Sequence, residues 1–164
     1  TRVKRETFGL SGRTQEIKRL IGRSLRAGFD LDLLGGRTFI VDCDVIQSDG
    51  GTRTASITGG YAALSLAVQR LVEGGAIPQQ AYLPPVAGIS VGMIGGIPIL
   101  DLDYEEDSQA EADLNVVMNE SGEYIEIQGT GEGGTFSRQD LDTMLEYASG
   151  GINQLISLQK ELLE

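Results

Sequence analysis

The sequence predicts an α+β fold in which helices pack on one side of a mixed sheet. Two features lead to this prediction. Long segments with apolar residues at helical spacing occur at residues 52–73 and 137–162, and short apolar segments occur in pairs separated by turn residues. Strands that pair mainly as hairpins, accompanied by a few helices, are typical of the α+β class. With 164 residues, the chain is long enough for one domain with a substantial core.

Three helices are expected. Residues 13–27 have aliphatic side chains at helical spacing and basic side chains on the opposite face, and Ser11 can cap this helix. Residues 52–73 are mostly small or aliphatic, which indicates a buried helix. Ser137 can cap the last helix, and Gly150-Gly151 should weaken or bend it, because glycine is a poor helix former.

About five strands are expected. Residues 37–46 are rich in β-branched side chains, which favour a strand. Residues 86–94 and 97–103 flank a glycine pair, and residues 114–119 and 124–128 flank a Glu-Ser-Gly turn, so each pair predicts a hairpin.

Composition excludes several classes of protein. No run of about 18 apolar residues is present, so no membrane span is expected, and the first residues lack the apolar core of a signal peptide. The chain has no histidine, which excludes a histidine-based catalytic triad, and its one cysteine, Cys43, excludes a structural zinc site. We interpret Cys43 as a small core residue, and a single cysteine fits a reducing cytoplasm.

Charge is distributed unevenly along the chain. The net charge is −11, but the first 26 residues carry eight basic and two acidic side chains, or +6, and the rest carries −17. A basic segment of this kind can bind a polyanion locally. The alternative interpretation is that these basic side chains form a solvated helix face or contact an acidic neighbouring subunit.

Residues 42–60, DCDVIQSDGGTRTASITGG, join the expected strand 37–46 to the helix at 52–73. The free N–H groups and the dipole at a helix N-terminus favour an anion, and Gly50 and Gly51 permit close approach of the backbone. Thr52 adds a hydroxyl donor and Arg53 a guanidinium that matches phosphate oxygens. A tight turn with a capping threonine and a surface arginine explains the same residues, and their spacing alone does not distinguish the two.

Carboxylates are concentrated between residues 101 and 113, a segment that we expect to contain a short helix. The seven residues are Asp101, Asp103, Glu105, Glu106, Asp107, Glu111 and Asp113. Two such carboxylates can bind Mg²⁺ together with water, and one member of a close pair can have a raised pKa and act as an acid. An exposed acidic loop is the simpler interpretation of the sequence alone.

The stretch at residues 42–60 also resembles the signature of the ribonuclease PH family. Three further segments support this resemblance: GRTQEIKRLIGRSLRAGFD at 12–30, SVGMIGGIPILDLDYEEDSQAEADLNVVM at 90–118 and IEIQGTGEGGTFS at 125–137. The resemblance implies a fold of the ribosomal protein S5 domain 2 type. It also implies a phosphorolytic 3′→5′ exoribonuclease, a nucleotidyltransferase that uses inorganic phosphate to remove 3′-terminal nucleotides of tRNA precursors as nucleoside diphosphates.

The resemblance further implies roles for individual residues. The co-substrate phosphate is expected at Arg13, Gly51, Thr52 and Arg53. Asp107 and Asp113 match two aspartates of the family that support Mg²⁺ binding and acid catalysis. Arg2 and Arg5 match basic residues near the path of the RNA.

The family also suggests partners and an organisation. We expect tRNA precursors and other RNA 3′ ends as substrates, a homo-hexameric ring of dimers and no membrane association. Two other hypotheses are a non-catalytic ring subunit of an RNA-degrading assembly and a small anion-binding domain without catalysis. We expect residues 1–164 to form one domain that lacks the family's N-terminal strands, and therefore to expose large apolar groups or an unpaired sheet edge.

Overall fold

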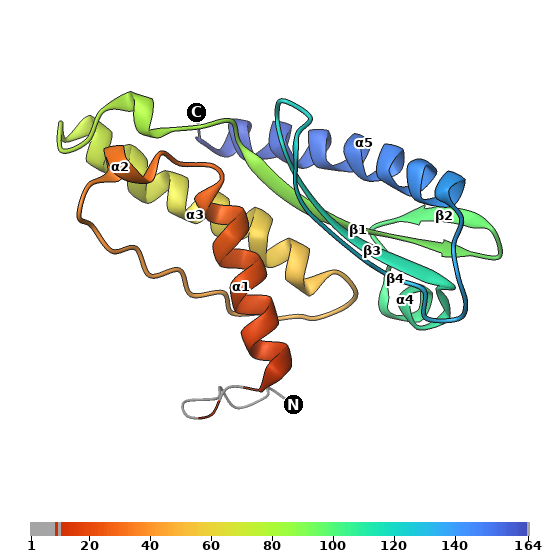
Figure 1. Cartoon of the computed structure of the whole chain (residues 1–164). Helices are drawn as coiled ribbons and strands as arrows, with labels where there is room; N and C mark the ends of the chain where they lie inside the picture. The colour runs from red at the N-terminus through yellow and green to blue at the C-terminus, as the bar shows by residue number, and fades with distance from the viewer. Residues whose placement is uncertain (1–8, 10, 164) are drawn as a thin grey trace.

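A computed structural model describes Gly9 and residues 11–163 (Figure 1). The three long helices are α1, Gly12–Arg26, α3, Thr52–Glu73, and α5, Arg138–Leu163. The expected helices are therefore confirmed, and the Ser11 hydroxyl accepts a hydrogen bond from the Thr14 amide at the start of α1. No helix in the described part of the chain is long and apolar enough to cross a membrane.

Three short helices complete the helical content. α4, Tyr104–Gln109, is the short helix expected in the acidic segment, and its N-cap Asp103 forms a capping box with Glu106. Two of them were not expected from the sequence: α2, Leu31–Leu34, and the 3₁₀ helix η1, Gln79–Ala81.

The sheet has four strands in the order β2-β1-β3-β4. Both expected hairpins are present: β1, Val86–Ile94, pairs with β2, Ile97–Leu100, and β3, Ala112–Asn119, pairs with β4, Tyr124–Thr130. β1 also pairs with β3. The α+β class is confirmed, but every pairing among the described strands is antiparallel, so the expectation of a mixed sheet is wrong. A hairpin turn reverses the chain, and the β1–β3 contact adds a third antiparallel pair.

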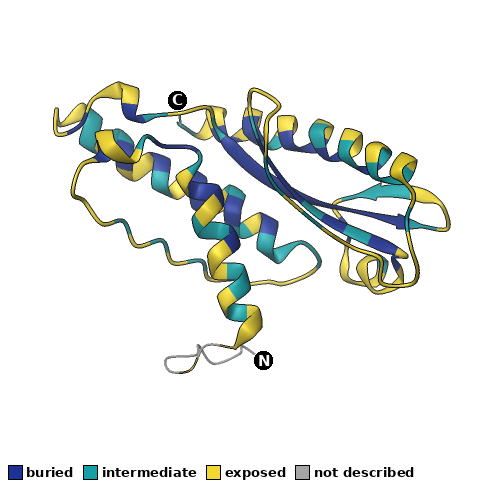
Figure 2. Cartoon of the chain, viewed as in Figure 1, coloured by how far each residue is buried: buried dark blue, intermediate teal, exposed yellow. Residues whose placement is uncertain are grey.

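Helices cover both faces of the sheet, which corrects the expectation of a one-sided arrangement. Alternate residues of β1 and β3 enter two separate apolar clusters, as the two-residue period of a strand requires. Ala87 and Val116 lie in the cluster with α5, whereas Val86 and Val117 lie in the cluster with α1 and α3. β1 and β3 are therefore buried on both sides, as Figure 2 shows.

α5 continues through the glycine pair that was expected to weaken it. Gly151 is buried, and a Cβ atom there would lie 2.6 Å from Ile89 Cδ1 and 2.9 Å from Leu100 Cδ2. The glycine therefore allows the helix to approach the sheet closely, and this packing offsets its low helix propensity.

Residues 37–46 do not form a strand, which contradicts the prediction. The segment is extended but pairs with no strand of the described chain (Figure 1). Phe39 and Val41 are half-buried against the α1–α3 cluster, whereas the side chains of Ile40 and Ile46 are 90% and 99% exposed. Burial thus alternates along the segment, but the described residues provide no strand to pair with it. The expected exposure of large apolar groups is confirmed.

Candidate active site

The N-terminus of α3 has free amide groups. Its N-cap is Gly51 rather than Thr52, and no side chain of the described residues caps it. Side chains do cap α1, α2 and α4, through Ser11, Asp30 and Asp103. Because Gly51 has no side chain and adopts a left-handed conformation with φ of 65°, the first N–H groups of α3 remain free to bind an anion.

The two glycines before α3 fix the position of this turn. A Cβ atom on Gly50 would lie 1.9 Å from the carbonyl oxygen of Leu102, so only glycine fits against the segment that follows β2. A Cβ atom on Gly51 would meet three oxygen atoms at 3.2–3.5 Å, belonging to Ser90, Thr54 and Asp101. The turn therefore packs directly against the end of the β1–β2 hairpin.

Asp49 connects this turn to the acidic helix α4. Its carboxylate oxygen accepts a hydrogen bond of 3.0 Å from the Gly50 amide and one of 2.7 Å from the Tyr104 amide. Tyr104 is the first residue of α4, which carries Asp107. A single carboxylate therefore holds the turn before α3 and the N-terminus of α4 together.

Arg53 lies in the first turn of α3 and contacts α1. Its Nη1 atom lies 3.7 Å from Glu16 Oε1, and both side chains are half-buried. Arg13 precedes Glu16 by three residues on α1, so the two lie on the same helix face. The contact therefore brings the N-terminal turns of α1 and α3 to the same side of the molecule.

Asp113 lies near the start of β3 and has an unusual environment. Its Oδ1 atom is buried and has no hydrogen-bond partner among the described residues. Burial raises the pKa of the Asp113 carboxyl, the negative charges of Glu132 and Asp107 raise this pKa further, and the positive charge of Arg53 lowers it. The Asp113 carboxyl is thus close enough to Asp107, Glu132 and Arg53 for their charges to shift its pKa.

Comparison with known proteins identifies the family. Domain 1 of the 3′ exoribonuclease family matches residues 2–68, and domain 2 matches residues 84–151. Ribonuclease PH of Corynebacterium efficiens is 56% identical over 164 residues, and that of Syntrophomonas wolfei is 57% identical over 165. The alignments cover 99% of this chain and 67% and 69% of those relatives. The chain belongs to the ribonuclease PH family.

As a member of the ribonuclease PH family, the chain is a phosphorolytic 3′→5′ exoribonuclease, a nucleotidyltransferase with inorganic phosphate as co-substrate. Solved structures agree with the fold. Rice (Oryza sativa) Rrp46 has a TM-score of 0.70 at 18% identity, covering 96% of this chain and 70% of that one. An Archaeoglobus fulgidus exosome with RNA bound to the active site has a TM-score of 0.67 at 16% identity, covering 93% and 64%.

The structure brings together several of the site residues that the ribonuclease PH resemblance implied. Arg53, Asp107 and Asp113 share one electrostatic environment, and Gly51 and Thr52 adjoin Arg53 at the start of α3. Arg13 is exposed on the first turn of α1, one turn from the residue that contacts Arg53.

Arg2 and Arg5 lie outside the described residues, so their expected place on the RNA path stays a prediction.

Sequence reasoning missed Glu16, Asp49 and Glu132. Glu16 and Asp49 act through contacts between residues distant in sequence, and the local pattern carries no signal for them. Glu132 had a signal: Asp113 pairs with Thr130 in the β3–β4 register, so the predicted hairpin places the loop after β4 beside Asp113.

Two carboxylates near Arg53 are of the kind that binds a divalent cation. No group of three or more histidine, cysteine, aspartate or glutamate side chains in the described part of the chain is arranged to hold a metal. Mg²⁺ needs only one or two carboxylates, however, since it retains several waters and binds substrate phosphates. Asp107 and the unpartnered Oδ1 of Asp113 are donors of this kind.

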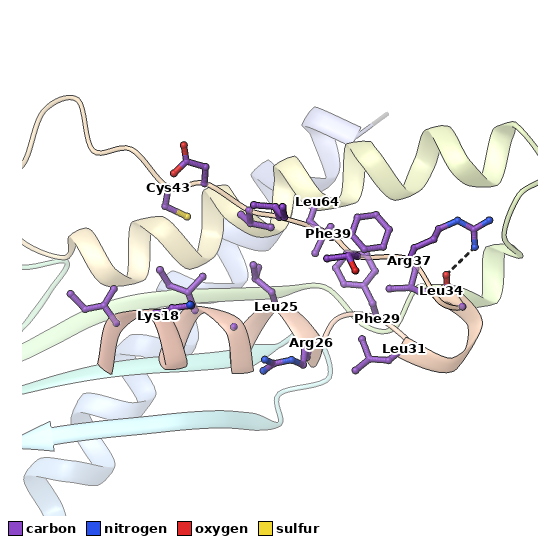
Figure 3. A pocket seen from close by; sticks show the side chains of 18 of the residues that line it. Lys18, Leu25, Arg26, Phe29, Leu31, Leu34, Arg37, Phe39, Cys43 and Leu64 are labelled. Carbon is purple, nitrogen blue, oxygen red and sulfur yellow. Dashed lines mark hydrogen bonds between the residues drawn. The ribbon is translucent and has the colours of Figure 1, made fainter. Parts of the chain in front are cut away.

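A concave surface lies beside α1, away from the α3 N-terminus (Figure 3). This groove of about 870 Å³ lies between α1 and the extended segment 37–43. Apolar side chains such as Leu25, Phe29 and Phe39 line it. Cys43 lies at one end, half-buried, and burial raises the pKa of its thiol, an effect that Asp42 increases. A raised pKa disfavours the thiolate, which agrees with a packing role for Cys43.

Proposed function

We propose that the uncapped N-terminus of α3 binds the attacking inorganic phosphate. The N–H groups at Gly51 and Thr52 and the guanidinium groups of Arg53 and Arg13 form the clamp. One observation supports this proposal most strongly. The free N–H groups of α3 and the Arg53 side chain lie in the same helical turn, and Arg53 lowers the pKa of the buried Asp113 carboxyl. Free N–H groups and guanidinium forks both match phosphate oxygens.

In the proposed reaction, an oxygen of the bound phosphate attacks the phosphorus of the 3′-terminal phosphodiester. A new P–O bond forms, and the bond from phosphorus to the 3′-oxygen of the preceding nucleotide breaks. The terminal nucleotide leaves as a nucleoside diphosphate, and the 3′-oxygen takes a proton, so the RNA is one nucleotide shorter. The protein contributes mainly by positioning the phosphate and neutralising charge.

We assign Asp107 and Asp113 to the leaving-group side of this reaction. Together they would hold Mg²⁺, which would supply positive charge to the phosphate oxygens. The alternative to metal binding is proton donation by Asp113, because its raised pKa increases the fraction of protonated carboxyl that can donate to the leaving 3′-oxygen. Replacement of Mg²⁺ by other divalent cations separates the two roles, because only the metal role makes turnover depend on the cation.

We propose tRNA precursors and other RNA 3′ ends as substrates, cytoplasmic location and a homo-hexameric ring of dimers as the working state. The curated relatives are ribonuclease PH, and the structural neighbours include an archaeal exosome core and an exosome with bound RNA. A non-catalytic ring subunit is the alternative. The arginine at the α3 N-terminus and the two aspartates favour the enzyme, because a scaffold has no need of a buried, unpartnered carboxylate beside a guanidinium.

We further propose that residues 1–164 form one domain of the ribonuclease PH type in which segment 37–46 pairs with strands from outside this range. The exposure of Ile40 and Ile46 and the greater length of the relatives support this arrangement.

The test of the proposed function is phosphate-dependent release of nucleoside diphosphate from a tRNA precursor by the full-length enzyme. We expect release to require phosphate and to fall strongly in Arg53→Lys, because lysine lacks the bidentate fork. Undiminished release in this folded variant, or release of nucleoside monophosphate in the absence of phosphate, contradicts the proposal.

A further inference from the structure

We propose that Glu16 is a positioning residue for Arg53, and that its carboxylate competes with the co-substrate phosphate for the Arg53 guanidinium. This inference rests on the proposed phosphate clamp. It adds a specific function for a carboxylate that neither the sequence pattern nor the comparisons assign. In the absence of phosphate, Glu16 holds the guanidinium beside the N-terminus of α3, and phosphate then displaces part of this interaction.

The contact geometry supports a competing rather than a fixed ion pair. Arg53 Nη1 and Glu16 Oε1 are 3.7 Å apart, which is beyond hydrogen-bond distance but within the range of an ion pair. The side chains are 30% and 39% exposed, so the pair is partly screened and open to an incoming anion. A guanidinium has five N–H donors, so one carboxylate at this distance leaves donors free for phosphate.

The Arg53–Glu16 pair should also affect phosphate binding, because other charges act on the same guanidinium. Arg53 faces Glu16 on α1 and also lowers the pKa of Asp113 on β3. Its guanidinium therefore interacts electrostatically with two carboxylates on different elements. The phosphate anion would bind at the same guanidinium and would be repelled by the Glu16 charge. Glu16 should therefore weaken phosphate binding while it keeps Arg53 oriented for the reaction.

The competing interpretation is that this pair only fastens α1 to α3. A purely structural pair changes stability when it is removed and leaves the phosphate kinetics of the folded enzyme unchanged. The proposed pair changes the Michaelis constant for phosphate and the turnover rate separately. The kinetic constants of charge-removing and charge-conserving variants distinguish the two interpretations.

The experiment compares Glu16→Gln, Glu16→Ala and Glu16→Asp in the full-length enzyme, with phosphate as the varied substrate and RNA saturating. Glutamine removes the charge but keeps the size of the side chain and a polar oxygen facing Arg53, so we expect KM for phosphate to fall roughly two- to fivefold with kcat nearly unchanged. Alanine also removes the side chain that faces Arg53, so we expect kcat to fall about tenfold. Aspartate keeps the charge, so KM should stay at or above the original value.

Glu126→Gln is the matched control. Glu126 forms an ion pair with Arg23 on the same helix α1, from strand β4, and is outside the phosphate clamp. This variant should change thermal stability and leave both phosphate constants unchanged. High salt should reduce the KM difference between Glu16→Gln and the original enzyme, since screening weakens the charge that the variant removes.

An unchanged or higher KM for phosphate in Glu16→Gln overturns the inference. If Glu16→Gln does not fold, the aspartate and alanine variants still test it, because equal kcat in the folded alanine variant and the original enzyme excludes a positioning role. The proposed function fails separately: it fails if Arg53→Lys retains full phosphorolysis. Loss of activity in Arg53→Lys with no kinetic effect at Glu16 overturns only the present inference.

Discussion

Gly50 offers a sharp test of how the fold positions the proposed phosphate clamp. A Cβ atom added at Gly50 would lie 1.9 Å from the carbonyl oxygen of Leu102, whereas Cβ atoms essentially never approach other atoms within 3.0 Å. In Gly50→Ala, the turn before α3 or the segment after β2 must therefore move by about 1.1 Å. Displacements of about 1 Å in a positioned reactant can lower rates by roughly 10²-fold.

The expected result for Gly50→Ala is a loss of about 10²-fold in kcat/KM for phosphate, equivalent to about 2.7 kcal/mol of transition-state stabilisation. Overpacking should also destabilise the fold by about 1–3 kcal/mol. The assay is nucleoside diphosphate release at varied phosphate, with thermal unfolding of the same preparation.

Gly59→Ala is the control for this prediction. Gly59 lies on α3, the helix that follows this turn, and a Cβ atom there has no neighbour within 4 Å among the described residues. This variant should retain activity and gain up to about 1 kcal/mol of stability, because alanine is the better helix former. Phosphate kinetics in Gly50→Ala equal to those of Gly59→Ala would refute the reasoning that this close contact positions the clamp.

Three further predictions concern the clamp, the buried carboxylate and the exposed segment. Arg53→Lys should lower kcat/KM for phosphate by about 10- to 10²-fold with the melting temperature nearly unchanged, and a loss of folding instead of activity would contradict it. Asp113→Asn should abolish most turnover yet raise the melting temperature near neutral pH. Because the folded-state pKa of Asp113 is raised, its stabilising contribution is complete below the unfolded value of 3.8 and is lost as pH rises through the folded pKa. The gain from asparagine should therefore shrink as the pH is lowered in calorimetry, and a gain that grows with acid would contradict this sign. Residues 1–164 expressed alone should self-associate through the exposed Ile40 and Ile46, and Lys at both positions should reduce association in sedimentation experiments; a cooperative monomeric melt of the unaltered segment would contradict this prediction.

The helices and hairpins were predictable because their signals are local. α3 begins and ends where the sequence analysis expected, since a continuous small and aliphatic segment is bounded by glycines on both sides. Both hairpins were found from their turn residues.

Segment 37–46 shows what a local pattern cannot provide. Its β-branched side chains favour an extended chain, and in the structure the segment is extended with Phe39 and Val41 half-buried. A strand, however, also requires hydrogen bonds to a partner, and the identity of that partner is absent from the pattern.

The candidate site likewise has a part that local sequence predicts and a part that depends on contacts between distant residues. The turn before α3 was predictable, because two glycines precede the expected helix, although the sequence alone did not distinguish an anion site from a tight turn. Its connections were not, since Asp49 reaches an amide 55 residues away and Glu16 reaches Arg53 from another helix. The orphaned Oδ1 of Asp113 depends on burial, which the acidic character of its segment concealed.

The position of bound phosphate tests the central claim most directly. A crystal structure of the full-length enzyme with phosphate should show an anion within hydrogen-bond distance of the Thr52 amide and the guanidinium groups of Arg53 and Arg13. Arg53→Lys crystals grown in the same phosphate concentration should show weaker density there, because the guanidinium fork is absent. An anion bound elsewhere with the α3 N-terminus empty, under conditions in which the enzyme releases nucleoside diphosphate, would contradict the account.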